Sequence, residues 1–213
     1  GMNDGQVWWP SALAFDSDDK LYVADEALNR ISIFTKDGEF LSQWGTPGSG
    51  PGQLDRPSGI AFDSSDNLLV TDSLNHRVQK FNRNGSFIGA WGEMGDGPGQ
   101  FNMPWGITID KSGDVYVADW RNDRIQVFDT EGNFVTLRTG DATVSKWGKD
   151  KLDANAEMWG ERDRAEGLER ERLFWAPSGI TVDDDNNVFV CESPRNRIQV
   201  YRKQSPTFAG PRL

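Results

Sequence analysis

The chain has 213 residues and a formal net charge of −10, which argues against a nucleic-acid partner because Lys and Arg supply most of the affinity for phosphate backbones. Its single cysteine excludes an internal disulfide framework, and it has no run of about 20 apolar residues that could span a membrane. No signal peptide is visible, so we expect a cytoplasmic location.

One pattern, of the form PSGIAFDSSDNLLVTD, occurs four times along the chain. The copies open at Pro10, Pro57, Pro104 and Pro177, at spacings of 47, 47 and 73 residues. The last spacing equals one repeat with an insertion of 26 residues. A fixed period of this length with strand-like residues inside it predicts an array of blades, each burying its faces against its neighbours.

The second copy shows what one unit contains. Short apolar runs at residues 59–63 and 68–72 flank a polar turn, and a third run at residues 78–81 is followed by a tight turn at Arg83-Asn84-Gly85 and a fourth run at residues 87–92. The unit is therefore predicted to be four antiparallel strands. Aromatic residues recur at fixed places, as blade packing requires: Tyr22, Leu69, Tyr116 and Phe189 in the second strand, Phe34, Phe81, Phe128 and Tyr201 in the third, and Trp44 and Trp91 in the fourth.

These residues resemble the NHL repeat family, and Ser73-Leu74-Asn75-His76-Arg77 carries its signature. The resemblance implies an all-β fold, a β-propeller of NHL type whose ring usually has six blades. We expect four four-stranded blades here, at about 7–56, 57–103, 104–148 and 177–213, in a chain that is a single domain, 1–213, or a fragment of one. We call the loop between the second and third strands of each blade the signature loop.

Residues 149–176, between blades three and four, are rich in helix formers and in opposite charges at helical spacing, such as Arg162 with Glu166. We predict a helical insertion there. Because it joins two blades, it is expected to emerge on the face that carries the signature loops and to pack Trp159, Leu168 or Phe174 against them, as a lid or a docking surface.

Several motifs favour structure over chemistry. Two glycine-rich stretches, residues 48–53 and 95–100, are expected to be connecting loops, and aspartates near 16 and 183 to be turn residues, so we expect no metal or cofactor. Cys191 is expected to be a buried packing thiol. Asp25, Asp72, Asp119 and Glu192 each precede an arginine by five residues in every blade, which indicates pairs that hold the signature loops.

Function should lie where the units differ, and the third unit differs most. It has Trp105 where the other units have serine after the proline, and it has Trp120 and Arg121 in its signature loop. The candidate ligand-binding residues around the channel mouth are Trp105, Trp120, Arg121, Arg56, Met103, His76 and Arg195. Flat rings and guanidinium groups suit binding of a partner with acidic groups, and the set contains no evident acid–base pair.

The sequence therefore predicts a binding or protein-interaction scaffold whose partner is a protein or a small-molecule ligand. A hydrolase or lyase acting in the channel is the alternative from a different class, and RNA binding comes third because of the charge. If the ring needs six blades, four leave the outer faces of the first and last sheets uncovered. Either the four blades close on themselves, or chains self-associate through their end blades, which is the outcome we expect.

Overall fold

The computed structural model describes residues 3–141, 146–164 and 172–203, and these form four antiparallel sheets in which strands are neighbours in chain order, as predicted. Each sheet is one blade. The strands are β1 (Pro10–Phe15), β2 (Leu21–Asp25), β3 (Arg30–Phe34) and β4 (Phe40–Trp44); β5 (Pro57–Phe62), β6 (Leu68–Asp72), β7 (Arg77–Phe81) and β8 (Phe87–Trp91); β9 (Pro104–Ile109), β10 (Val115–Asp119), β11 (Arg124–Phe128) and β12 (Phe134–Arg138); and β13 (Pro177–Val182), β14 (Asn187–Glu192) and β15 (Arg197–Arg202). The fourth strand expected in the last blade falls beyond residue 203, outside the described residues.

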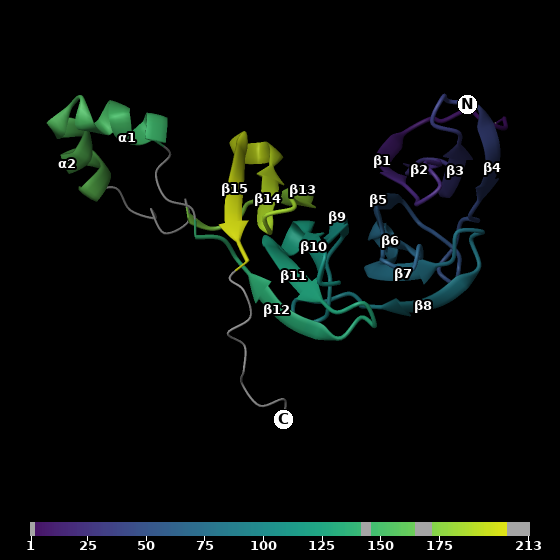
Figure 1. The fold of residues 1–213 in the computed structure, drawn as a ribbon. Coiled ribbons are helices and arrows are strands. Elements are labelled where there is room, and N and C mark those ends of the chain that lie inside the picture. Colours follow the sequence, from purple (N-terminus) through teal and green to yellow (C-terminus); the bar gives the residue numbers. More distant parts are fainter. Residues whose placement is uncertain (1–2, 142–145, 165–171, 204–213) are drawn as a thin grey trace.

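The four blades form an open arc of a β-propeller (Figure 1). The first strand of each blade lies on the concave side, where β1 packs on β5, β5 on β9 and β9 on β13. No comparable packing joins β13 back to β1 in the described part of the chain, so the four blades do not close a ring by themselves. The closed four-bladed ring considered from the sequence is therefore not what the structure shows.

Glycine at the centre of the inner strands allows the blades to approach one another. A Cβ atom at Gly59 would lie 2.4 Å from the backbone oxygen of Trp105 in the next blade, and one at Gly106 would lie 2.6 Å from the oxygen of Ser178. Real Cβ atoms do not tolerate such distances, so the strands at the axis pack backbone against backbone. This close approach brings the first strands of successive blades side by side on the concave side of the arc.

The hydrophobic core is divided among the three interfaces between blades. Each blade has a leading face, which packs on the blade before it, and a trailing face, which packs on the blade after it. In the second blade Ile60, Leu68 and Phe81 belong to the leading face, whereas Leu69 and Val78 belong to the trailing face. All five are at most 5% exposed, and burying side chains of this size is worth about 2 kcal/mol each. Each blade is thus stabilised chiefly by its neighbours.

Two helices, α1 (Lys146–Asp153) and α2 (Ala156–Arg164), lie between β12 and β13. Figure 1 shows both helices away from the sheets, beyond the fourth blade, so the expected lid over the signature loops is not supported. Leu168 and the side chain of Trp159 lie outside the described residues. Phe174 is buried, but it packs between blades with Tyr116 and Val188, in the register that Leu54 and Phe101 occupy in the preceding repeats. Phe174 therefore belongs to the repeat, although the sequence had assigned it to the insertion.

Candidate functional site

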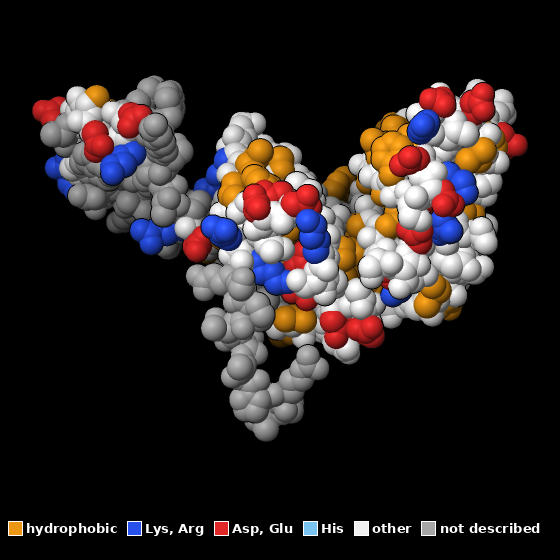
Figure 2. Space-filling model, viewed as in Figure 1, with side chains coloured by type: hydrophobic (Ala, Val, Ile, Leu, Met, Phe, Trp, Pro, Cys, Tyr) orange, Lys and Arg blue, Asp and Glu red, His pale blue; other side chains and the backbone are white. Residues whose placement is uncertain are grey.

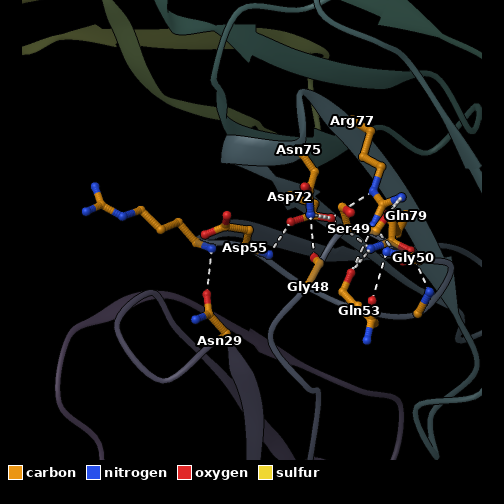
Figure 3. Close-up of polar contacts among 12 residues, drawn as sticks. Asn29, Gly48, Ser49, Gly50, Gln53, Asp55, Asp72, Asn75, Arg77 and Gln79 are labelled. Carbon is orange, nitrogen blue, oxygen red and sulfur yellow. Dashed lines mark hydrogen bonds and ion pairs between the residues drawn. The ribbon is translucent and has the colours of Figure 1, made fainter.

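A buried carboxylate holds each signature loop, and Asp72 in the second blade shows how (Figure 3). One carboxylate oxygen accepts the backbone N–H of Asp55 at 2.6 Å. The other accepts hydrogen bonds from the side chains of Asn75, Arg77 and Gln79 at 2.8 to 2.9 Å. Burial raises the pKa of Asp72, and these donors oppose the rise by stabilising the ionised form. The carboxylate joins the signature loop to the connection from the blade before.

The arginine of the same pair fixes the glycine-rich connection. Its guanidinium donates to the backbone oxygens of Ser49, Gly50 and Gln53 at 2.9 Å (Figure 3). Arg124 does the same in the third blade, donating to the oxygens of residues 96, 97 and 100. The glycine-rich stretches are therefore connecting loops, and the acid–arginine pairs of the second, third and fourth blades are structural, as predicted. The pair predicted in the first blade is not formed, because Arg30 donates to the backbone oxygens of Asn3 and Gln6 and its Nε has no partner among the described residues.

The first blade has an incomplete version of this arrangement. Ser32 stands where the other blades have Gln79, Gln126 and Gln199, and its short side chain makes no hydrogen bond to Asp25. The buried hydroxyl of Ser32 and the Nε of Arg30 both lack a partner. Asp25 instead accepts four backbone N–H groups, from Trp8, Trp9, Ala27 and Leu28.

Three of the candidate ligand-binding residues take part in a second repeated contact between blades. The Nδ1 atom of His76 accepts the backbone N–H of Met103 at 3.1 Å. In the same way Asn29 Oδ1 accepts the N–H of Arg56 at 2.7 Å, and Asp123 Oδ1 accepts that of Ala176. His76 is thereby engaged through its ring in holding the blades, whereas the side chains of Arg56 and Met103 remain available at the surface, exposed and half-buried respectively.

The third blade carries an aromatic and cationic cluster on the signature-loop face. The rings of Trp105 and Trp120 lie 5.8 Å apart between centroids, and the Arg121 guanidinium sits 5.1 Å above the Trp120 ring. Both tryptophans are half-buried and Arg121 is exposed. Trp105 also lines an open hollow of about 380 Å³ along the inner strands. The structure therefore joins three of the predicted residues at the edge of the channel.

The fourth blade repeats the pairing of a tryptophan with an arginine. Arg195 lies 5.4 Å above the ring of Trp175, which is 52% exposed, and donates a hydrogen bond to the oxygen of Leu173. Arg195 was predicted from the sequence to belong to the site, whereas Trp175 was not, and neither were Trp8 and Trp9 of the first blade, which are more than half exposed. Trp8 and Trp175 share one register of the repeat, two residues before the proline, but Asp55 and Asn102 fill it in the middle blades, so the register did not mark either tryptophan as an exception.

Groups that could support metal or nucleophilic chemistry are few. Within residues 3–141, 146–164 and 172–203 no three His, Cys, Asp or Glu side chains come together as metal ligands. Asp16 and Asp183 accept backbone N–H groups of their own turns. Cys191 is exposed, so its predicted burial is wrong. It lies on the trailing face of the last blade, and its counterpart on the trailing face of the second blade, Thr71, is fully buried. No helix in the described part of the chain has the length and apolar composition to cross a membrane.

Comparisons with known proteins agree with this architecture. The NHL repeat family matches residues 54–81, 101–128 and 174–201, and no match was found among curated proteins. A catalytically inactive virginiamycin B lyase from Staphylococcus aureus, solved with quinupristin, is similar with 17% identity and a TM-score of 0.58 over 91% of this chain and 55% of that one. A protein of unknown function from Bacteroides thetaiotaomicron has 19% identity and a TM-score of 0.62 over 90% of this chain and 46% of that one.

A protein of unknown function from Bacteroides caccae has 12% identity and a TM-score of 0.54 over 92% of this chain and 61% of that one. The chain thus spans about half the length of these three proteins. At such identities the similarity shows a shared fold.

Proposed function

Because the chain is built from NHL repeats, whose fold suits a binding or scaffold role, we propose that it binds a protein or peptide partner on its signature-loop face. The partner has acidic groups beside apolar or aromatic ones. The observation that carries this proposal is that two adjacent blades each present a tryptophan with an arginine stacked above it, Trp120 with Arg121 and Trp175 with Arg195.

The chemistry of these pairs supports a peptide ligand. Tryptophan offers a large, rigid contact area at low entropic cost, and tryptophan and arginine are the residues most enriched among those that dominate binding energies. A planar guanidinium recognises carboxylate with two parallel hydrogen bonds. Arg56, which precedes β5 of the second blade, adds an exposed guanidinium to the exposed Arg121 and the half-buried Arg195.

Three arginines come from successive blades of this face, namely Arg56, Arg121 and Arg195. Glu26 lies close to Arg56, and Asp123 follows Arg121 in the same signature loop, so the arginines alternate with carboxylates. Acidic groups of a partner that pair with these arginines would fix its orientation on the face.

Selection from a display library of random 12-residue peptides, followed by fluorescence anisotropy of the enriched peptides, tests the proposal. We expect enriched sequences to combine Asp or Glu with aromatic residues, and Trp120→Ala and Arg121→Ala each to weaken binding about tenfold or more. Val135→Ala is the matched control, because Val135 is 54% exposed on β12, away from the signature loops. If no peptide is enriched, or if enriched peptides bind both variants as tightly as the unaltered chain, the proposal fails.

A further inference from the structure

We propose that the junction between the first and second blades carries a second binding site, which takes a neutral saccharide. The site is an open hollow of about 410 Å³, a size typical of small-molecule sites. Its walls are β4 and the end of the turn between β1 and β2 in the first blade, and the turn between β7 and β8 in the second. Both blades lie wholly within the described residues. In an antiparallel sheet these turns lie at the end opposite the signature loop, so the site is independent of the proposed peptide-binding face.

Polar side chains with free hydrogen-bonding capacity line the hollow. Ser42 of β4 and Asn84 of the turn between β7 and β8 are exposed, and neither side chain has a hydrogen-bond partner among the described residues. Arg83 donates through Nη1 to Asp18 at 2.8 Å, whereas its Nε and Nη2 atoms donate to no described residue. A hydroxyl and an amide both donate and accept, and the free edge of a guanidinium donates two parallel bonds. This set complements neighbouring hydroxyl groups on one ligand.

An aromatic ring that is held in place supplies the apolar part of the wall. The half-buried ring of Trp44 lies 4.7 Å from that of Phe81 between centroids, and a Cβ atom at Gly85 would lie 2.4 Å from Trp44 Cγ. The second blade therefore fixes Trp44 before any ligand arrives, which lowers the entropic cost of binding. Leu41, which is 46% exposed, adds apolar surface to the wall. A sugar ring has apolar C–H faces as well as hydroxyl groups, so it can contact both kinds of wall at once.

The charges around the hollow favour a neutral ligand. Nη1 of Arg83 lies 3.6, 2.8 and 3.5 Å from carboxylate oxygens of Asp16, Asp18 and Asp66, and the Lys20 ammonium lies 3.5 Å from Asp18. The three carboxylates would repel an anion, and the two cations in the wall would repel a cation. Figure 2 shows the same alternation on the face in view, where positive and negative side chains are interspersed over the first two blades. The ion pairs also hold Arg83 and Lys20 in position for a ligand.

The polar lining belongs to this junction and not to the repeat as such. Three polar residues of the wall are replaced by apolar or small residues one repeat later: Tyr22 by Leu69, Ser42 by Gly89 and Gln43 by Ala90. Arg83, which enters the hollow from the second blade, corresponds to Thr130 in the third. The residues that line the hollow are thus exceptions to the period, whereas the residues that build the blades follow it.

An array of neutral and acidic glycans, probed with the fluorescently labelled chain and followed by titration calorimetry of the glycans that bind, tests this proposal. We expect neutral glycans to bind, and Ser42→Ala and Asn84→Ala each to weaken binding about fivefold, which is the effect of losing one hydrogen bond. Glu131→Ala is the matched control, because Glu131 is exposed at the position of Asn84 in the third blade. This control variant should bind like the unaltered chain.

Arg83→Lys tests the role of the guanidinium separately from its charge. Lysine keeps a cation beside the three aspartates but lacks the planar group that donates two parallel bonds, so we expect binding to weaken about tenfold while the urea midpoint of unfolding stays nearly unchanged. Binding of acidic glycans alone would overturn the conclusion about charge and with it the proposal. The proposal also fails if no glycan binds, or if all three altered chains bind neutral glycans as tightly as the unaltered chain.

Discussion

The Nδ1 atom of His76 lies 3.1 Å from the backbone nitrogen of Met103 and accepts its hydrogen bond, which ties the signature loop of the second blade to the connection that enters the third. In the preceding blade, Asn29 makes the equivalent contact through Oδ1. We therefore expect His76→Asn to keep the free energy of unfolding nearly unchanged, and His76→Ala to lower it by about 1 kcal/mol through loss of this bond. Urea denaturation of both variants measures the difference. Equal destabilisation by Asn and Ala would mean that ring packing, and not the hydrogen bond, is what His76 contributes.

Replacing Ser32 with Gln should stabilise the first blade. In the second blade the glutamine at this register, Gln79, donates hydrogen bonds to Asp72 at the start of the signature loop and to the backbone oxygen of Gln53 in the connecting loop. In the first blade the hydroxyl of Ser32 is buried without a partner. We expect Ser32→Gln to raise the free energy of unfolding by about 1 kcal/mol, measured as a higher urea midpoint. Ser42→Gln, on the exposed side of β4, should leave the midpoint unchanged; a fall in the midpoint for Ser32→Gln would show that the site cannot accommodate the longer side chain.

Protonation of Asp63 should lower the free energy of unfolding in acid. Burial disfavours the ionised form of this carboxyl, but the Lys80 ammonium at 2.8 Å and N–H donors from Asn67 and Ser65 outweigh burial, so its pKa is lowered. A group whose pKa is lower in the folded state stabilises the fold above its unfolded pKa, near 4, and this contribution is lost as the pH falls through the folded value.

Asp63→Asn should therefore flatten the dependence of the unfolding free energy on pH below about 4, while lowering stability at pH 7 by about 1 kcal/mol. Asparagine keeps the turn, since Asn82 accepts the same pattern of backbone N–H groups in its own turn. Asp184→Asn, at a surface carboxylate whose side chain is 90% exposed, is the control and should leave the slope unaltered. If the free energy of unfolding depends on pH equally in the unaltered chain and in Asp63→Asn, then Asp63 is not the group that makes stability fall in acid.

The sequence predicts the blades well because the same order of strands and turns recurs in four copies of one pattern. Strand order, the turns, the connecting loops and the pairing of Asp72 with Arg77 all follow from residues that recur at a period of 47. Departures from the period were harder to place. Phe174 keeps its place three residues before the repeat proline, but its position next to the insertion disguised that register.

The candidate site was predicted incompletely, because the sequence marks unusual residues and does not say which of them already bond to the backbone. Trp105, Trp120 and Arg121 were found as exceptions to the repeat, and they lie together. His76 was equally conspicuous, yet its ring serves as a hydrogen-bond acceptor for the next blade. Trp175 was missed because its register tolerates Asp55 and Asn102 elsewhere, so no single repeat looks exceptional there. The open ends of the arc depend on the angle between sheets, which residue spacing does not encode.

Each interface between blades joins a trailing face to a leading face, and this regularity bears on how a gene that encodes such repeats can change. Every interior junction in this chain joins the same two kinds of surface, so duplicating or deleting one 47-residue unit creates no junction of a new kind. Unequal recombination between repeats can thus alter the number of units in one event without compensating substitutions at the join. The residues that distinguish one unit from another, such as Trp120 and Trp175, are then free to diverge at the rim after each duplication, while the faces between the sheets stay under the common constraint of fitting their own copies.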